Sequence, residues 1–174
     1  MVANAQTLQQ SIQRSTAQTF TDAMSRAVSG VSIVTTDGPN GQFGLTVSSM
    51  TSVSASPPML LVCVNRSSVA HDAIRDNERF AINVLAAEQR DIANQFAGRS
   101  DNGGRYLFDQ ATWDSSNALP RLRNAAAYFE CSLVSAMTFG SHSIFVAQVM
   151  DSDAGDDTPL LYTGRNYGRP VELN

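Results

Sequence analysis

Hydroxyl side chains are concentrated in one uncharged part of the chain. Residues 38–65 carry no charged side chain, and seven of the fifteen residues in 44–58 are serine or threonine. An apolar run at 59–64 follows, and then Asn65-Arg66-Ser67-Ser68. Uncharged donors followed by one guanidinium suit a large, flat, anionic ligand, because phosphate takes N–H, O–H and guanidinium donors and a planar ring needs apolar walls. A serine- and threonine-rich edge strand with a solvated loop explains the same composition.

Three further polar positions could contact a ligand. His142 stands in a short turn before an apolar strand, where it can face a ligand or bond to local backbone. Asn83 alternates with apolar residues, so its amide lies on a solvated face or holds a buried partner. Tyr167 and Arg169 belong to an aromatic and arginine cluster that could stack on a base and pair with a phosphate, or pack against a neighbouring subunit.

Several classes of function are disfavoured. The net charge is −4 and the chain has no lysine, which argues against nucleic-acid binding and excludes lysine catalysis. A Gly-x-Ser-x-Gly elbow is missing and His71, beside Asp72, is expected on an exposed helix face, so a hydrolase is not indicated. Two histidines without paired carboxylates do not predict a metal site. Cys63 and Cys131 are expected to be reduced core thiols.

Neither a secretory signal nor an apolar run of membrane-spanning length is recognisable, so we expect a soluble, cytoplasmic protein without membrane contact. The length fits one domain over 19–174, preceded by a mobile tail over 1–18.

Strand patterns outnumber helix patterns along the chain. A helix is expected from Phe20 to a stop at Gly30, followed by a hairpin of strands at 31–36 and 44–50. Further strands are expected at 59–64, 80–85, 126–137 and 143–152, and helices from a Ser67 or Ser68 cap to 76 and over 88–96. Residues 99–124 are expected to be irregular with a loop tip at 101–104, and 151–157 to be a solvated acidic loop. This order predicts a mainly β fold with short helices (α+β), based on a β-barrel, and not a doubly wound fold.

Taken together, these segments resemble the short flavin reductases, the reductase components of two-component aromatic monooxygenases of the hydroxyphenylacetate and phenol/chlorophenol type. The matching pieces occur in the family's order from residue 20 to 167: they are the strand at 31–36, Gly44-Leu-Thr-Val-Ser-Ser49, Ser54-x-x-Pro57-Pro58, Asn65-x-Ser67-Ser68, the strand at 80–85, Gln89 to Phe96, the strand around Cys131, Gly140-Ser-His142 and Pro159-Leu-Leu-Tyr162. One position departs from the family pattern, since Ser141 stands where the family often has an aspartate that could orient the histidine.

The resemblance implies a split β-barrel of the FMN-binding type that binds flavin and forms a homodimer. It also implies an NAD(P)H-dependent flavin reductase, NADH:FAD oxidoreductase being favoured over FMN use, which supplies reduced flavin to a separate phenol-type monooxygenase. A non-catalytic flavin-binding protein on the same barrel is the alternative. Because hydride transfer between two stacked rings needs no protein acid or base, no catalytic residue is expected.

Within this resemblance each segment receives a part of the ligands. Residues 46–49 are expected at the flavin ring and ribityl chain, 65–68 at the flavin phosphate, 96–99 at the adenine end of FAD, and His142 with 167–169 at the nicotinamide nucleotide. The complete set of expected cofactor-binding residues is Thr46, Val47, Ser48, Ser49, Ser54, Asn65, Arg66, Ser67, Ser68, Asn83, Phe96, Ala97, Arg99, His142, Tyr167 and Arg169.

Overall fold

The computed structural model describes residues 16–39, 41–98, 108–114, 116 and 118–173 of the 174-residue chain. The expected loop tip at 101–104, the predicted site residue Arg99 and most of the expected tail lie outside these residues. In chain order the elements are a helix over 16–24, β1 (Ser29–Gly30), β2 (Ser32–Thr36), β3 (Phe43–Val47), β4 (Thr51–Ala55), β5 (Pro58–Asn65), α2 (Val69–Asn77), β6 (Arg79–Val84), the 3-10 helix η1 (Ala87–Gln89), α3 (Arg90–Phe96), β7 (Trp113–Asp114), β8 (Arg121–Leu122), β9 (Ala127–Phe139), β10 (His142–Ala154), β11 (Leu161–Thr163) and β12 (Asn166–Gly168).

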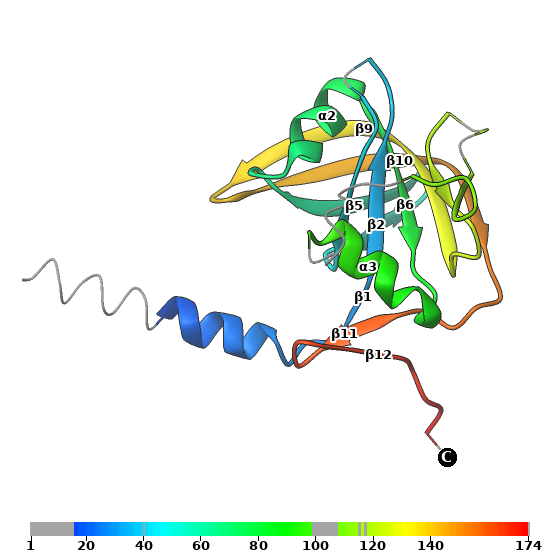
Figure 1. Ribbon diagram of the computed structural model, residues 1–174. Coiled ribbons are helices and arrows are strands. Elements are labelled where there is room, and N and C mark those ends of the chain that lie inside the picture. Colours follow the sequence, from blue (N-terminus) through cyan, green and yellow to red (C-terminus); the bar gives the residue numbers. More distant parts are fainter. Residues whose placement is uncertain (1–15, 40, 99–107, 115, 117, 174) are drawn as a thin grey trace, which may run out of the picture.

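One large curved sheet forms the body of the molecule (Figure 1). Its strand order is β3-β2-β6-β9-β10-β5-β4, and all neighbouring strands run antiparallel. The sheet curls so that β3, at one edge, approaches β5, which is next to the other edge. Ser49, just beyond β3, bonds to the backbone of Cys63 in β5, but no ladder joins the two strands in the described part of the chain. The result is an open barrel.

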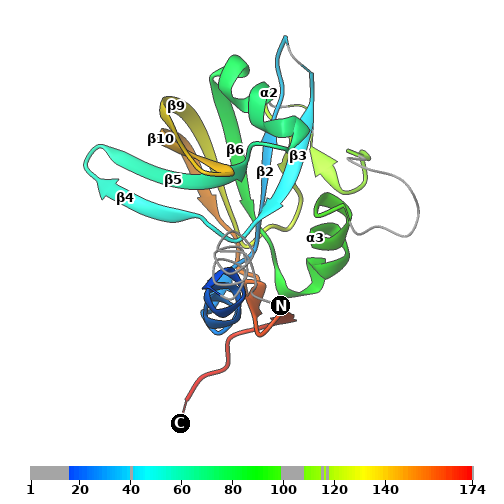
Figure 2. The same cartoon turned by 90° about the vertical axis from the view of Figure 1, so that its left-hand side faces the viewer.

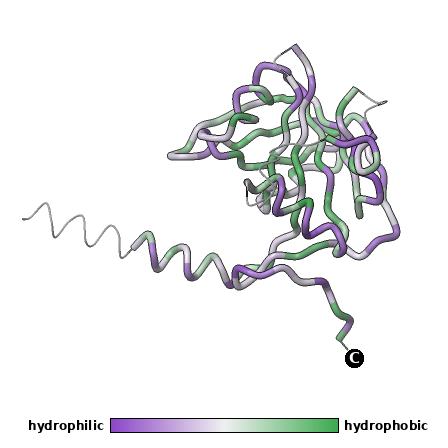
Figure 3. Tube along the Cα trace, in the orientation of Figure 1, coloured by the Kyte–Doolittle hydropathy of each residue, from purple (hydrophilic) through white to green (hydrophobic). Residues whose placement is uncertain are grey.

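The interior of this curl is filled by alternate side chains of the strands. Val34 of β2, Val62 of β5 and Phe80 of β6 are buried there together with Ile74 of α2. The other side of β2 is also covered, because Ile33 packs with Leu85, Phe96 and Trp113 under α3. Strand β2 is therefore buried along its whole length, and its buried hydroxyls find partners inside the protein, as where Thr35 Oγ1 donates to the Pro120 carbonyl. Figure 3 shows hydrophobic colour through the central strands, with hydrophilic colour on many peripheral loops.

Helix α2 lies over one end of the sheet, and α3 lies beside β3 on its outer side (Figure 2). The Ser68 hydroxyl accepts a hydrogen bond from the Ala70 N–H group and caps α2, as the sequence predicts. Helix α2 ends where Glu78 adopts a left-handed conformation. Helix α3 ends at Phe96. Two residues later, Gly98 has a φ of 72°, a left-handed conformation with which a right-handed helix cannot continue.

Strands β9 and β10 form a long hairpin closed by a two-residue turn. Phe139 and His142 are register partners, and Gly140 between them has a φ of 56° that favours glycine. The turn therefore places His142 as the first residue of β10, at the end of a rigid strand.

The structure confirms the hairpin of β2 and β3 and the strands β5, β6, β9 and β10, but it corrects other expectations. Asp151 to Ala154 continue β10, because they pair with the start of β9, so the acidic segment is partly strand. The first helix ends at 24, and Gly30 pairs with Leu161 in a three-stranded sheet of β1, β11 and β12. Strand β4 is an edge strand within the serine- and threonine-rich stretch, as the alternative interpretation of that stretch expected, and the small β7–β8 pair lies in the segment expected to be irregular.

The helix over 16–24 projects away from the sheet (Figure 1) and includes 16–18 of the expected tail. Its base is held by the turn between β11 and β12, where Arg165 Nη2 donates to Asp22 Oδ1 at 2.6 Å and the Gly164 N–H donates to the Ser25 carbonyl. The described part of the chain contains no helix of the length and apolar character needed to span a membrane.

Candidate functional site

The predicted hydroxyl-rich segment forms the wall between two hollows of the structure. One, of about 250 Å³, is lined by Leu45, Thr46, Val47, Ser48, Ser49, Cys63, Asn65 and His142. The second, of about 140 Å³, is lined by Val31, Thr46, Val47, Ser48, Ala97, Tyr162 and Tyr167. Both share residues 46–48, so they lie along one stretch of chain. We call the pair the β3 groove.

A third hollow adjoins the second one at Tyr167. It has a volume of about 270 Å³ and is lined by Ala87, Glu88, Arg90, Leu160, Tyr167, Gly168 and Arg169. The predicted His142 and Asn65 therefore line the first hollow, the predicted Tyr167 lines the second and third hollows, and the predicted Arg169 lines the third.

The hydroxyls of the β3 groove have different tasks. Thr46 Oγ1 donates to the Ala93 carbonyl at 2.7 Å and ties β3 to α3. Ser49 Oγ donates to the Cys63 carbonyl and accepts from the Cys63 N–H group. Ser48 is exposed, and its hydroxyl bonds to no residue that the structure describes. Ser48 is thus the hydroxyl of this group that is available to a ligand.

Backbone donors are also available beside Ser48. The β2–β3 ladder ends at the pair Ser32 and Val47, and the β4–β5 ladder begins at Thr51 and Leu61. Within the described part of the chain, residues 48–50 have no ladder partner. A ligand ring in the groove would meet N–H groups here and the apolar side chains of Val47 and Val31 beside them.

The loop after β5 is ordered by its own side chains. Asn65 Oδ1 accepts hydrogen bonds from both the N–H group and the hydroxyl of Ser67, each at 2.9 Å. The Ser68 N–H group donates to the Asn65 carbonyl, and the Ser68 hydroxyl caps α2. The donors of Ser67 and Ser68 that were expected to bind a phosphate are therefore mostly used within the loop. Arg66, the cation of this segment, is left as the main candidate to bind the phosphate.

Arg66 holds the loop against the turn that precedes β10. Its N–H group donates to the Ser141 carbonyl at 2.9 Å, and its Nη1 donates to the Gly140 carbonyl at 3.4 Å. An arginine side chain has five N–H donors, so most of this exposed guanidinium remains free for an anion. The same turn orients His142, whose Nδ1 lies 2.9 Å from the hydroxyl of Ser141. Ser141 thus supplies the imidazole partner that the missing family aspartate would give.

At the other end of the groove, two tyrosines pack edge to face. The ring centroids of Tyr162 and Tyr167 are 5.4 Å apart, and the Tyr167 hydroxyl donates to Asn94 Oδ1 of α3 at 3.1 Å. Ala97, the C-cap residue of α3, lines the same hollow as predicted. Arg169 lines the third hollow from the exposed chain after β12.

Two predicted site residues are parts of the core. Asn83 is completely buried: its amide nitrogen donates to the Ile33 carbonyl and to Thr35 Oγ1, and its Oδ1 accepts from the Leu122 N–H group at 2.7 Å. Phe96 is only 2% exposed. We therefore correct both assignments, because both side chains are buried and neither lines any of the three hollows.

Phe96 packs within 5.3 Å of the rings of Phe108 and Trp113. It also lies so close to Gly44 that a Cβ there would stand 2.6 Å from the ring.

Ser54 is not brought to the groove. It lies on β4, where its hydroxyl accepts a hydrogen bond from the Ser56 N–H group, and it lines none of the three hollows. Conversely, the sequence analysis missed Cys63 as a lining residue. The alternation along β5 could have found it, because Val62 and Val64 are buried in the core and Cys63 must face the other side.

Cys63 is half-buried at the groove and Cys131 is buried in the core, and both are free thiols. Burial raises the pKa of Cys131 to about 12.

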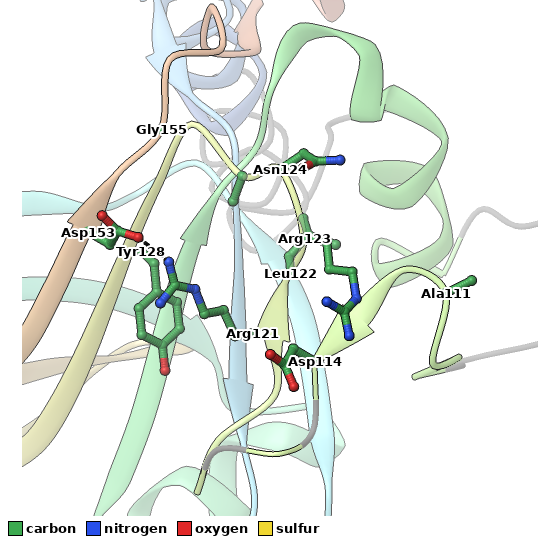
Figure 4. A pocket seen from close by; sticks show the side chains of 10 residues that line it. Ala111, Asp114, Arg121, Leu122, Arg123, Asn124, Tyr128, Asp153 and Gly155 are labelled. Carbon is green, nitrogen blue, oxygen red and sulfur yellow. Dashed lines mark hydrogen bonds and ion pairs between the residues drawn. The ribbon is translucent and has the colours of Figure 1, made fainter.

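A larger hollow of about 390 Å³ lies elsewhere, beside β8 and the ends of β9 and β10 (Figure 4). Arg121 forms an ion pair with Asp153 and stacks on the Tyr128 ring at 4.7 Å. Arg123 and Asp114 lie on the opposite wall. Hydrogen bonds from Ser116 hold the pKa of Asp114 below its usual range, with smaller contributions from the two arginines. Two arginines and two aspartates line this hollow, and Arg121 is already paired with Asp153 and stacked on Tyr128, so it is less suited to a flavin ring than the β3 groove.

His71 contradicts the expectation of an exposed residue. It is 7% exposed, with Nε2 2.9 Å from the Ser143 hydroxyl and Nδ1 2.9 Å from Asp72 Oδ1. This is the Ser-His-Asp order of a hydrolase. Ser143, however, is 2% exposed and its hydroxyl also bonds to Thr138, so no substrate can reach it.

Comparison with known proteins decides the family. The family model described as "Flavin reductase like domain" matches residues 24–170. The chain belongs to this flavin reductase family. The flavin reductase chain is 38% identical over 150 residues to the FMN reductase (NADH) RutF of Stutzerimonas stutzeri (strain A1501), covering 85% of each chain.

Solved structures agree with the open barrel described above. BorF, the flavin reductase component of a bacterial two-component tryptophan halogenase, has a TM-score of 0.80 and 30% identity over 90% of this chain and 99% of BorF. The NADH:FAD oxidoreductase SgcE6 of Streptomyces globisporus C-1027, in complex with NAD and FAD fragments, has a TM-score of 0.77 and 28% identity over 87% of this chain and 91% of its own. The expected mainly β, split-barrel fold of the flavin reductase is thereby confirmed.

Proposed function

We propose that this protein is an NADH-dependent flavin reductase whose flavin lies in the β3 groove. The observation that best supports this proposal is the position of residues 46–48. They line both hollows of the groove and offer uncharged hydrogen-bond donors beside apolar side chains. The same residues fit a flat ring, because Val31 and Val47 supply apolar contact and Ser48 with its neighbouring backbone supplies hydrogen bonds.

A bound flavin would accept a hydride from the nicotinamide ring of NADH. The part of the protein is to position both molecules and to keep water away from them. Ser48 and the backbone of 48–50 bond the polar edge of the ring, where N–H groups stabilise the negative charge that reduction brings. Arg66, bound to the turn at 140–141, holds the flavin phosphate.

The nicotinamide nucleotide is proposed to contact His142 at one end of the groove. At the other end, Tyr167 offers a stacking surface, and Arg169 offers a cation for the pyrophosphate in the third hollow. Arg165 is less suited to this part, because its guanidinium is paired with Asp22.

We propose FMN as the flavin that the described residues fit most directly, although FAD is the flavin that the sequence resemblance favoured. Of residues 96–99, which were expected to meet an adenine, Phe96 is buried in the core and Arg99 lies outside the described residues, while Ala97 lines the second hollow. The RutF relatives are named FMN reductases, whereas SgcE6 is named for FAD. FAD presents the same ring and first phosphate, so it would use the same residues.

Reduced flavin is proposed to pass to a separate flavin-dependent oxygenase. BorF belongs to a two-component halogenase, and a further structural relative at 26% identity is the reductase of a styrene monooxygenase. A phenol-type partner remains the prediction from the sequence resemblance, as does a cytoplasmic location.

We also propose that the protein works as a homodimer. Several large apolar side chains are exposed on projecting elements, which is typical of an interaction surface. They lie on and just after the first helix and on the β9–β10 hairpin: Phe20, Met24, Val28, Val134, Met137, Phe139 and Met150. Light scattering on the full chain is expected to give twice the monomer mass, and a monomer at micromolar concentration would refute this proposal.

The test of the activity is anaerobic addition of NADH to the protein mixed with FMN. A reductase bleaches the visible flavin absorbance at a rate proportional to protein concentration. If FMN binds, as seen by quenching of its fluorescence, but NADH causes no bleaching, the protein is the non-catalytic flavin binder that is the alternative. The same assay with FAD and with NADPH ranks the four ligand combinations.

A further inference from the structure

A chain of hydrogen bonds, buried at His71 and Ser143 and ending at the exposed side chains of Asp72 and Thr138, connects α2 with the first residues of β10. His71 Nδ1 lies 2.9 Å from Asp72 Oδ1, His71 Nε2 lies 2.9 Å from Ser143 Oγ, and Ser143 Oγ lies 3.0 Å from Thr138 Oγ1. The ring of His71 also packs edge-on against Phe145 at 5.4 Å. Side chains from α2, β9 and β10 are thus joined, and the central contact between His71 and Ser143 is buried.

The direction of this chain follows from its end groups. Hydrogen bonds from His71, and the nearby Arg75, hold the pKa of Asp72 below its usual range, so its carboxylate only accepts. His71 Nδ1 therefore carries a proton, and in the neutral ring Nε2 accepts from the Ser143 hydroxyl. The Ser143 oxygen can then accept from Thr138. Both ring nitrogens of His71 thus have a partner, which holds the imidazole in one orientation.

Ser143 follows His142 directly, and successive side chains of a strand point to opposite faces. His142 lines the groove, while Ser143 is buried against His71. In the β10–β5 ladder, His142 is paired with Asn65 and Ser143 with Val64. The bond between His71 and Ser143 thus holds the strand from behind at the point where His142 faces the ligand site.

The same histidine stands three residues after the Ser68 cap of α2, and its N–H group donates to the Ser68 carbonyl. The loop 65–68, which carries Arg66, leads directly into this turn of helix. One residue therefore connects the loop proposed for the flavin phosphate, through its backbone N–H group, with the strand end proposed for the nicotinamide, through its side chain.

We propose that His71 is a positioning residue: through its hydrogen bond to Ser143 it fixes His142 against NADH. This inference rests on the proposed function of His142. His71 touches neither ligand, and its role is to limit the movement of the β10 start relative to α2.

A pair of matched variants tests the hydrogen bond between His71 and Ser143. His71→Gln places an amide near the position of Nε2 and can keep the bond to Ser143, whereas His71→Asn reaches only the position of Nδ1 and keeps the bond to Asp72. Since one hydrogen bond contributes roughly 1 kcal/mol, His71→Asn is expected to raise the KM for NADH about fivefold with kcat little changed. His71→Gln is expected to restore a KM close to that of the wild type.

A double-mutant cycle with His142→Ala decides whether His71 acts through His142. The effect of His71→Asn on the KM for NADH is expected to disappear in the His142→Ala background. If the increase in the KM for NADH in the double variant equals the product of the increases in the two single variants, the proposal is overturned. If His142→Ala alone leaves the KM for NADH unchanged, the assignment of His142 fails, and His71 then has no ligand contact to position.

Two controls keep these outcomes clear. Ser143→Ala removes the same bond without altering α2, and it is expected to raise the KM for NADH by the same factor as His71→Asn. It therefore also tests the proposal if His71→Asn does not fold. The urea unfolding midpoint and the dissociation constant of FMN, measured by fluorescence quenching without NADH, separate positioning from general loss of structure. Equal losses of FMN binding, NADH use and stability in the Asn and Gln variants would show a purely structural role and overturn the proposal.

Discussion

The hydroxyl of Ser49 makes two hydrogen bonds to a single residue, since it donates to the Cys63 carbonyl at 2.9 Å and accepts from the Cys63 N–H group at 3.0 Å. It thus substitutes for a strand neighbour between β3 and β5, which no ladder joins. Cys63, Ser49 and Asn65 all line the groove, so this contact joins two sides of its wall.

Ser49→Ala is therefore expected to destabilise the protein and to weaken flavin binding together. The change leaves two backbone groups of Cys63 without a partner, which costs about 1–3 kcal/mol in the free energy of unfolding. Urea unfolding and FMN titration measure the two effects. Ser49→Thr, which keeps the hydroxyl, is the matched control, and wild-type stability in Ser49→Ala would contradict the role given to this contact.

Arg66→Ala is expected to weaken the binding of FMN but not of riboflavin. A charge-assisted hydrogen bond contributes about 1.5–3 kcal/mol, so the KM for FMN should rise roughly 10-fold or more. Riboflavin has the same ring without the phosphate and serves as the matched ligand. Steady-state NADH oxidation with each flavin gives both values. Equal losses with the two flavins, or no loss with FMN, would show that Arg66 does not hold the phosphate.

Asn83→Ala is expected to act on stability alone. The substitution leaves the buried Leu122 N–H group and Thr35 without their amide partner, and an unsatisfied buried group costs about 1–3 kcal/mol. The free energy of unfolding should fall accordingly, while the dissociation constant of FMN stays at the wild-type value at temperatures where the variant is folded. A selective loss of FMN affinity with unchanged stability would return Asn83 to the ligand site.

Alkaline pH is expected to destabilise the folded protein through two buried groups. Burial, with a smaller contribution from Glu130, raises the pKa of Tyr128 from 10.0 to about 12 and that of Cys131 from 9.0 to about 12. Both groups hold protons more tightly when folded, so their contribution is complete below the unfolded values and is lost as pH rises from about 9 toward 12.

Tyr128→Phe tests this linkage. The Tyr128 hydroxyl is buried without a partner in the described part of the chain, so its removal should not lower stability at pH 7. Above pH 10 the free energy of unfolding should fall less steeply with pH than in the wild type, as measured by urea unfolding at fixed pH values. Identical slopes in the two proteins would contradict the raised pKa.

Local patterns were sufficient for much of the fold. The cap at Ser68, the glycine at 140 and the alternation in 80–85 are short-range signals, and the elements they predict are present. Elements that depend on distant partners were missed. Strand β11 exists because Ser29 and Gly30 pair with it across the molecule, and the end of β10 is strand because β9 continues beside it.

The site was predictable to the same extent. Residues 46–48 and His142 could be proposed because hydroxyl density and a turn before a strand are visible in the sequence, and in the structure these residues line the β3 groove. The expectations for Asn83, Phe96 and His71 were wrong because all three side chains are buried by residues far away in the chain. Asn83 and His71 form hydrogen bonds to such residues, and Phe96 packs against one. A polar or aromatic residue on a strand or helix does not reveal which face is covered until the neighbouring elements are known.

The central claim is that the flavin lies against residues 46–48 while NADH reduces it, and the most direct test is NADH oxidation by a variant whose groove is filled. Ser48→Arg adds a long side chain at an exposed position in the wall shared by the two hollows, and Ser52→Arg adds the same chain at an exposed position on β4 outside them. The account predicts that Ser48→Arg raises the KM for FMN by about tenfold or more, equivalent to at least about 1.4 kcal/mol, while Ser52→Arg keeps the wild-type value. Wild-type kinetics in Ser48→Arg, with normal folding, would contradict it.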